Sequence, residues 1–277
     1  MPWVLNFLQV VVWLANVESS CSDWRLNSIS PVPSMQEFKA HVSRIKDLTH
    51  DVRELELSLI APELIKFKAG QWISLNVWHP RLHQHVPRQY SIASPPSQCQ
   101  QIKLLFNRVP DGPGSSYLFS LHEGDPLQFQ GPSGSFYLEE KPGRDLVFVA
   151  TGSGIAPFCS LIPTFLEKAE PGTLTLYWGL RSQRDLYYQN ELETLAQRHP
   201  NFSFITTLSR PENGWKGSIG RVTTLVENNI SSVSNVTFFL CGNGSMIRDA
   251  TAIVRKKGLC PIRTEQYYDE AGAGTDD

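Results

Sequence analysis

The hydrophobic pattern of this chain changes once, near residue 142, and that change restricts the possible folds more than any other feature. From about Gln36 to Lys141, apolar and polar residues alternate, as in VRELELSLI (52–60) and GQWISLNVW (70–78). Alternation with a period of two is typical of strands that bury one face. Gly/Pro turns such as VPDGPG and GPSG separate these runs. We therefore predict that this half forms an antiparallel β-barrel or sandwich.

After KPGRD the pattern is different. DLVFVA (145–150) is a continuous apolar run, which is typical of a parallel strand covered on both faces. Four further strand patterns follow, at TLTLYWG, FSFITTLS, VTFFLC and PIRTEQY, and helix patterns alternate with them. We predict an open, doubly wound parallel sheet of five strands. The predicted division of the chain is an extension at 1–35, a barrel domain at 36–141, an α/β domain at 142–268 and an acidic tail at 269–277.

Composition excludes several classes of protein. The 277 residues carry a formal net charge of −2 and no Lys/Arg-rich run, so nothing indicates nucleic-acid binding. The five cysteines are far apart and form no CxxC pair, which argues against a metal site, an iron–sulfur cluster and a disulfide framework. His79, His83 and His85 lie in a proline-containing loop without nearby cysteine or carboxylate, so we expect no metal there. A reducing, cytoplasmic setting fits this composition best.

The first residues raise a question of targeting. MPWVLNFLQVVVWLANV is apolar, but Asn6, Gln9 and Asn16 interrupt it and no basic residue precedes it. It is shorter than the roughly 20 residues that a membrane-spanning helix needs, and it lacks a basic n-region. Residues 3–17 are therefore either a targeting or anchor segment, or a poorly ordered extension from a start site assigned too early. We expect the fold to begin near Gln36.

The strongest local motif in the second half is ATGSGIAPF (150–158), between a predicted strand and a predicted helix. Gly152 and Gly154 permit close backbone approach, and the free amides of a helix N-terminus favour a phosphate. Pro157 suits the first helical turn, where its missing N–H costs nothing. The motif is not GxGxxG. It indicates either a phosphate-binding loop or an ordinary turn.

A second motif, RQYSIAS (88–94), lies between two proline-marked turns in the first half. A strand-like segment seldom holds an arginine without a partner, so Arg88 predicts an anion. Tyr90 predicts a flat group packed beside it. The alternative is a surface arginine and a core tyrosine on an edge strand.

Together these segments resemble the ferredoxin–NADP reductase superfamily, from about Phe38 to Tyr268. RQYS matches the R-x-Y-S flavin motif, GPGSSYL (112–118) is similar to the G-x-x-S-x-Y-L motif, and TGSGIAP is similar to the nicotinamide-nucleotide loop. FKAGQWISL, GPSGSF, YWGLR, LCGNGSM and the late E-x-Y (265–267) follow the same order. The order of the motifs makes the resemblance specific.

The resemblance implies that the barrel binds FAD. Arg88 would bind a flavin phosphate, Tyr90 would pack on the isoalloxazine, and Ser91 would lie near the flavin N5. Gly114 and Ser115 would offer backbone amides to the pyrophosphate, and the Ser115 hydroxyl would cap the short helix or bind phosphate. The implied FAD-binding residues are Arg88, Gln89, Tyr90, Ser91, Gly114, Ser115, Ser116 and Tyr267.

The resemblance also implies NAD(P)H as the substrate of the α/β domain. Cys241 would seat the nicotinamide, and Glu265 would contribute to hydride-transfer geometry, which gives Ser91, Cys241 and Glu265 as the implied catalytic residues. A buried, inert thiol is the alternative for Cys241. The implied NAD(P)-binding residues are Thr151, Gly152, Gly154, Ile155, Pro157, Arg181, Ser209, Arg210, Cys241, Gly242 and Met246.

Two further assignments stay open at this stage. Tyr267 matches the family's terminal aromatic, which covers the flavin, but here the chain continues through Tyr268 and DEAGAGTDD, so either tyrosine is a candidate. Ser209, Arg210 and Arg181 favour NADPH over NADH, since no acidic residue is evident at that strand end.

The resemblance implies a reductase that passes electrons from NAD(P)H through FAD to a separate carrier, such as ferredoxin or flavodoxin. The sequence has no plant-type C-x₄-C-x₂-C segment that would hold a cluster. Two alternatives remain: the reductase component of an oxygenase system, and a non-catalytic flavoprotein module for docking or sensing.

Overall fold

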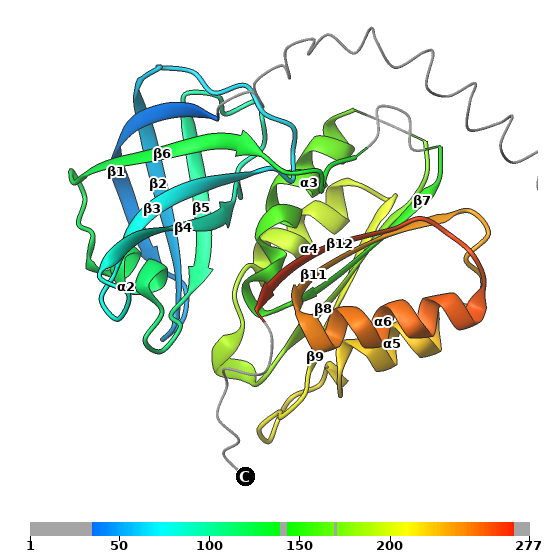
Figure 1. Cartoon of the computed structure of the whole chain (residues 1–277). Helices are drawn as coiled ribbons and strands as arrows, with labels where there is room; N and C mark the ends of the chain where they lie inside the picture. The colour runs from blue at the N-terminus through cyan, green and yellow to red at the C-terminus, as the bar shows by residue number, and fades with distance from the viewer. Residues whose placement is uncertain (1–34, 139–142, 169–170, 269–277) are drawn as a thin grey trace, which may run out of the picture. The chain divides into compact units, whose positions relative to one another are not determined.

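The computed structural model describes residues 35–138, 143–168 and 171–268. An antiparallel sheet and a parallel sheet follow each other along the chain (Figure 1), and the change between them falls where the hydrophobic pattern changes. The apolar segment 3–17 and the tail 269–277 lie outside the described residues.

The first half is a curved antiparallel sheet in the order β4-β3-β6-β1-β2-β5. Its strands are β1 (Gln36–Asp47), β2 (Val52–Ala61), β3 (Trp72–His79), β4 (Gln84–Ser91), β5 (Gln101–Asn107) and β6 (Pro126–Ser133), with helix α2 (Pro113–Ser120) between β5 and β6. The predicted alternation is confirmed, because Leu55, Leu57 and Ile73 are all fully buried in one hydrophobic core.

The second half is a parallel sheet in the order β10-β9-β8-β7-β11-β12. Its strands are β7 (Asp145–Thr151), β8 (Leu174–Leu180), β9 (Phe202–Leu208), β10 (Ser218–Ile219), β11 (Val236–Asn243) and β12 (Ile262–Tyr268). The sheet has six strands, so the prediction of five was wrong by one. The additional strand, β10, has two residues, which is too short to produce a periodic pattern.

Helices cover both faces of the parallel sheet, which confirms the doubly wound prediction (Figure 1). They are the 3₁₀ turns η1 (Gly152–Ile155) and η2 (Gln183–Asp185) and the helices α3 (Ala156–Glu167), α4 (Gln189–Arg198), α5 (Val222–Asn229) and α6 (Gly244–Lys257). One core cluster includes residues of α3 and α4, and another includes residues of α5 and α6. Pro157 lies in the first turn of α3, as predicted.

Side chains from the two halves bond to each other directly, and the described residues from Gln36 to Tyr268 belong to one compact unit. The Ser160 hydroxyl of α3 donates to the Ser94 carbonyl at 2.7 Å, in a fully buried position. The Ser153 hydroxyl of η1 donates to the Asn107 side-chain oxygen, also at 2.7 Å. These contacts bring the segment after β4 against α3 and the end of β5 against the turn that follows β7.

Within the described ranges, no helix is both long enough and apolar enough to cross a membrane.

The aromatic packing beneath η1 generates a stability prediction. Phe148 is fully buried, stacks on Phe158 with ring centroids 4.6 Å apart, and meets Phe239 edge-on. Phe148→Ala should lower the free energy of unfolding by about 3–5 kcal/mol, because the substitution removes both ring contacts and leaves a cavity in the core. Urea denaturation measures this change. Ile219→Ala is the control, since Ile219 is 66% exposed and should change stability by less than about 0.5 kcal/mol. A loss below about 1 kcal/mol for Phe148→Ala would contradict the packing argument.

Candidate functional site

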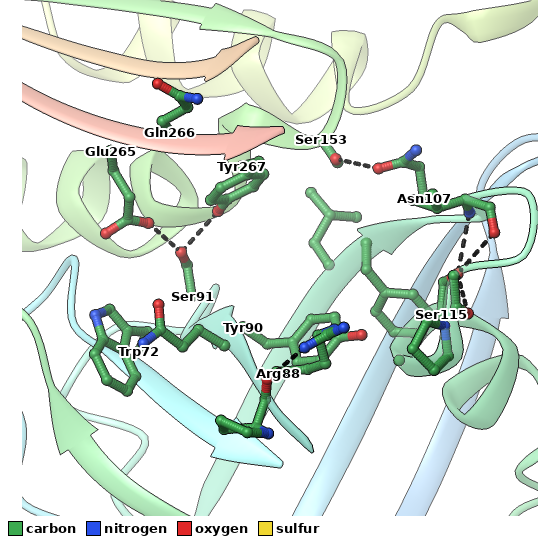
Figure 2. Close-up of a pocket in the computed structure, with 18 residues that line it drawn as sticks. Trp72, Arg88, Tyr90, Ser91, Asn107, Ser115, Ser153, Glu265, Gln266 and Tyr267 are labelled. Atoms are coloured by element: carbon green, nitrogen blue, oxygen red, sulfur yellow. Dashed lines mark hydrogen bonds between the residues drawn. The ribbon is translucent and has the colours of Figure 1, made fainter. Parts of the chain in front are cut away.

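Residues from both halves line one cavity of about 440 Å³ (Figure 2). From the antiparallel half come the end of β4, the end of β5, and the loop that leads into α2. From the parallel half come Ser153 of η1 and three consecutive residues of β12, Glu265, Gln266 and Tyr267. The volume lies in the range of sites for small molecules and cofactors.

Arg88 and Tyr90 lie two residues apart on β4, so the strand's pleat directs both side chains to the same face. Both line the cavity (Figure 2). The Arg88 guanidinium donates to the Pro87 carbonyl at 2.8 Å, and it forms no ion pair with any described carboxylate. A cation without an anionic partner, in a cavity wall, is suited to an anionic ligand.

Tyr90 packs against a second aromatic ring and stays neutral. Its ring and that of Phe106 form a T-shaped pair, with centroids 5.8 Å apart. Burial raises the pKa of the Tyr90 hydroxyl to about 12, although the nearby Arg88 opposes the shift. Tyr90 is therefore a neutral aromatic at neutral pH.

The first turn of α2 approaches β4 closely, and only glycine fits at its centre. A Cβ at Gly114 would lie 2.3 Å from the Tyr90 hydroxyl oxygen and 3.1 Å from the Arg88 side chain. The absence of a side chain at Gly114 therefore brings the start of α2 against Tyr90 and Arg88. Gly112 is the N-cap and Pro113 begins the helix.

Ser115 has a different local role from the cap that was predicted. Its hydroxyl accepts from the Val109 amide at 3.1 Å and lies 3.2 Å from the Gly112 carbonyl, so it bonds the loop before α2 to the helix. No side chain caps α2. Of the two roles predicted for the Ser115 hydroxyl, the helix cap is wrong, because Ser115 falls inside the first turn and not at its start. Phosphate binding stays a prediction. Ser116 lies on the exposed side of the helix.

At the other end of the cavity, one hydrogen-bonded chain joins β4 to β12. The Tyr267 hydroxyl donates to the Ser91 hydroxyl at 2.7 Å, and Ser91 donates to the Glu265 carboxylate at 2.5 Å (Figure 2). The Tyr267 hydroxyl also lies within hydrogen-bonding reach of the Cys241 thiol. Cys241 is fully buried and directly paired in register with Glu265. The structure thus brings together all three residues predicted to be catalytic.

Burial changes the protonation of this cluster. It raises the pKa of Glu265 from 4.5 to about 7, although the hydrogen bond from Ser91 opposes the shift. Burial also raises the pKa of the Cys241 thiol, and the nearby Glu265 carboxylate adds to that effect. Burial raises the pKa of Tyr267 as well. Cys241 is a neutral thiol at neutral pH, whereas the carboxyl of Glu265 titrates close to neutral pH.

The turn after β7 and the end of β11 pack together through glycine. A Cβ at Gly154 would lie 2.5 Å from the Cys241 carbonyl oxygen, and one at Gly242 would lie 2.3 Å from the Thr151 hydroxyl. The Thr151 hydroxyl in turn accepts from the Asn243 amide at 3.1 Å. Gly152 differs, because it has a φ of +52° and open space where a side chain would be. Of the two predicted glycines, Gly152 faces open space and Gly154 packs against β11.

The remaining predicted residues fall into two groups. The Arg210 amide donates to the Arg181 carbonyl at 2.7 Å, and Ser209 bonds to Leu180, so these residues gather at the ends of β8 and β9. Ile155 and Met246 instead bury their side chains in the hydrophobic clusters on opposite faces of the parallel sheet. Their side chains contribute to packing.

Sequence reasoning missed several residues that line the cavity. Asn107 and Ser153 meet there, and Trp72 forms part of the wall. Asn107 ends an apolar run at the end of a strand, and Ser153 lies between the two glycines of TGSG, so both had a weak local signal. The histidine loop is separate: His83 and His85 pack edge-on against Trp78.

Comparison with protein families assigns the two halves. Residues 39–137 match the oxidoreductase FAD-binding domain, and residues 148–252 match the oxidoreductase NAD-binding domain. With the two sheets and the shared cavity, these matches define a flavin-dependent oxidoreductase that uses a nicotinamide nucleotide.

Individual relatives agree with this class. The chain is 32% identical to ferredoxin–NADP reductase B of Sorangium cellulosum, over 84% of this chain and 98% of the relative. It is 30% identical to the reductase component of the naphthalene 1,2-dioxygenase system of Pseudomonas putida, over 87% of this chain and 75% of the relative. Its fold matches a ferredoxin–NADP⁺ reductase of Neisseria gonorrhoeae with bound FAD and NADP, with a TM-score of 0.71 and 25% identity, over 85% of this chain and 99% of that one. The chain belongs to the ferredoxin–NADP reductase superfamily.

The cavity fits FAD on two structural grounds. The first is the Arg88 guanidinium, which is suited to an anion and has no carboxylate partner among the described residues. The second is the approach of α2 at Gly114, which directs the amides of a helix N-terminus toward the same end of the cavity.

The buried carboxyl of Glu265 generates a prediction about pH. The folded pKa of about 7 exceeds the unfolded value of 4.5, so the fold favours the protonated form. The stability that depends on this proton is complete below about pH 4.5 and is lost as the pH rises through about 7, at most about 3 kcal/mol. Glu265→Gln stays neutral. The free energy of unfolding of the variant, relative to the native protein, should therefore increase as the pH rises from about 4.5 to 7.5. Denaturant titrations across this range measure the difference. If the free energies of unfolding of the two proteins changed with pH in parallel, the pKa of Glu265 would not be raised in the folded protein.

Proposed function

We propose that this protein oxidises NAD(P)H and passes the electrons through FAD to a separate carrier protein, such as ferredoxin, flavodoxin or an oxygenase component. The observation that carries the proposal is the shared cavity, which has an anion-binding end at Arg88 and Gly114 and a polar end at Ser91, Glu265 and Tyr267. When bound, FAD supplies a hydride acceptor that can release electrons one at a time. The protein orients the flavin and the nucleotide, provides polar groups around them and excludes water from the site.

In this proposal, the antiparallel half holds the flavin. Arg88 pairs with a phosphate, and the backbone amides of Gly114, Ser115 and Ser116 contribute the positive end of α2. The Tyr90 ring packs beside the isoalloxazine, and Gln89 contributes backbone contacts on the same strand. Ser91 directs its hydroxyl to the flavin N5, which requires it to exchange one of its present partners.

The parallel half holds the nicotinamide nucleotide. Thr151, Gly152 and Gly154 form the turn that meets the pyrophosphate, supported by the packing of Ile155, Pro157 and Met246. Cys241 and Gly242 form the wall beside the nicotinamide, and Glu265 maintains the geometry of the reacting atoms through Ser91. The neutral thiol of Cys241 suits a packing role, because burial disfavours the thiolate.

Tyr267 is the residue that we propose to cover the flavin. Its ring lies in the wall of the cavity and its hydroxyl bonds Ser91, and these two contacts support a place on the side from which a nicotinamide would approach. The ring must then move for the nucleotide to react. The side chain of Tyr268 lies outside the described residues, and its part in covering the flavin stays a prediction.

The relatives support an external acceptor. One is named a ferredoxin–NADP reductase, and another is the reductase component of a dioxygenase system. We propose the same chemical class of partner here: a redox protein that accepts single electrons.

The domain limits and the cellular setting complete the proposal. We propose that the FAD domain spans 36–141 and the nucleotide domain spans 142–268, which agrees with the end of β6 at Ser133 and the start of β7 at Asp145. A cytoplasmic location is proposed as well. Four cysteines of the described ranges carry free thiols, which fits a reducing compartment.

Flavin binding and turnover test the proposed function. The purified protein should be yellow, contain FAD by mass, and reduce ferricyanide with NAD(P)H. Arg88→Ala should weaken FAD binding about tenfold to a hundredfold, because a charge-assisted bond contributes about 1.5–3 kcal/mol. Arg44→Ala, which removes an exposed arginine of β1 in the same half, should leave FAD affinity unchanged. A protein that takes up no FAD would refute the proposal.

Nucleotide preference generates a separate prediction. Arg210 and Arg181 lie together and exposed at the ends of β8 and β9, and we propose that they meet the 2′-phosphate of NADPH beside Ser209. Arg210→Ala should raise the KM for NADPH about tenfold or more and leave the KM for NADH nearly unchanged, since only NADPH loses a charge-assisted contact. Arg198→Ala, an exposed arginine at the end of α4, is the control. Equal effects of Arg210→Ala on both nucleotides would favour NADH as the substrate.

A further inference from the structure

A further polar contact joins the two halves away from the cavity lining, and it centres on the carboxylate of Glu54. This residue lies on β2 and is only 5% exposed. One carboxylate oxygen accepts a hydrogen bond from the hydroxyl of Tyr188, which precedes α4 in the parallel half. The other oxygen lies 3.1 Å from the Lys103 ammonium of β5. Both oxygens of a buried carboxylate are thus satisfied, one from each half of the protein.

The residue before Tyr188 contacts the proposed nucleotide loop. The Tyr187 hydroxyl donates to the Gly152 carbonyl at 3.1 Å, and the Trp178 indole donates to the same carbonyl at 3.0 Å. Gly152 is the first residue of η1, and its φ is positive. Two donors on one carbonyl oxygen fix the orientation of this peptide, since they use both of its lone pairs.

The backbone at Tyr188 makes this double attachment possible. Tyr188 has a φ of +57° in the left-handed region, which non-glycine residues rarely adopt. This conformation turns the chain between two adjacent tyrosines, so that Tyr187 bonds Gly152 while Tyr188 bonds Glu54. Such a conformation persists only where the surroundings hold it in place. Burial raises the pKa of the Tyr188 hydroxyl, so it remains a donor at neutral pH.

The Lys103 end of the contact is also tied to both halves. The Lys103 amide donates to the Ser94 hydroxyl at 3.1 Å, and the Ser94 carbonyl accepts from Ser160 of α3. The Lys103 ammonium lies 3.6 Å from Glu56 as well. The Glu54 carboxylate is therefore fixed from the barrel side, and Tyr188 binds to a fixed acceptor.

We propose that Tyr188 is a positioning residue: by bonding Glu54 it fixes, together with the bond from Ser153 to Asn107, the distance between the turn at Gly152 and the flavin half of the protein. The proposal rests on the function proposed above. A nucleotide bound at this turn must bring its reacting carbon to within about 3–3.5 Å of the flavin, and a misplacement of about 1 Å lowers the rate about a hundredfold. A hydrogen bond between a phenol and a buried carboxylate is directional, whereas an apolar contact would allow the halves to slide. Tyr188 itself touches neither ligand.

Tyr188→Phe tests this role because it removes one oxygen atom and keeps the ring. In the FAD-loaded protein, the rate of flavin reduction by saturating NAD(P)H in stopped flow should fall about tenfold or more. FAD content should be unchanged, and the dissociation constant of the oxidised nucleotide should change less than about threefold, since the contacts to each ligand remain. The primary deuterium isotope effect on reduction should change too, because the geometry of the reacting atoms changes. A residue that only stabilised the fold would lower the melting temperature and leave the reduction rate and the isotope effect unaltered.

Two further variants identify the contact. Glu54→Gln keeps an acceptor oxygen for Tyr188 and should retain the reduction rate within about threefold, whereas Glu54→Leu removes the acceptor and should match Tyr188→Phe. The double variant Tyr188→Phe/Glu54→Leu should be no slower than either single variant, because both remove the same bond. The matched control is Tyr177→Phe, which removes the hydroxyl of a buried tyrosine on β8 that packs with the α5 and α6 cluster. It should reduce flavin at the native rate.

Amide hydrogen exchange of the FAD-free protein supplies a readout that does not depend on catalysis. Tyr188→Phe should speed exchange at residues 151–155 about tenfold or more, and Tyr177→Phe should not. If the native protein neither binds FAD nor oxidises NAD(P)H, the proposed function fails first. If the native protein is active but Tyr188→Phe reduces flavin within about twofold of its rate, only the positioning role fails. Unchanged exchange at residues 151–155 would overturn the positioning role in either case.

Discussion

The chain of hydrogen bonds from Tyr267 through Ser91 to Glu265 is the contact on which the cavity depends. It joins the end of β4 to β12, which are 174 residues apart along the sequence at Ser91 and Glu265. The serine hydroxyl accepts one hydrogen bond and donates another, so removing either partner leaves a buried polar group without its bond. Burial also raises the pKa of Glu265 to about 7, so the charge of this carboxyl changes close to neutral pH.

Glycine packing supports the cavity from behind. Gly154 and Gly242 allow the turn after β7 to touch the end of β11, and this contact sets Cys241 behind the polar chain. The same packing explains why a G-x-G pattern is an ambiguous signal in a sequence. Gly152 faces open space, whereas Gly154 leaves space for the neighbouring backbone.

The fold could be predicted from sequence to a large extent because its periodicities are local. Leu55 and Leu57 alternate with polar residues, and the apolar run of β7 indicates a parallel strand. Strand β10 could not be predicted, since two residues carry no period. The same alternation places Glu54 on the solvent side of β2, but the parallel half covers it, and only the tertiary structure reveals that burial. The contact between Ser153 and Asn107 could not be predicted from the sequence either, because it joins residues 46 positions apart.

The left-handed backbone at Tyr188 implies a conflict between the stability of the fold and the rate of turnover. Glycine would adopt this conformation freely, whereas a side chain there costs about 1 kcal/mol. Selection for a more robust fold would therefore favour replacing the tyrosine, and each such replacement would discard the phenol that reaches across to β2. Engineering this protein for heat tolerance by relieving backbone strain would thus remove a side chain that binds no ligand and that, on the proposal made above, sustains turnover.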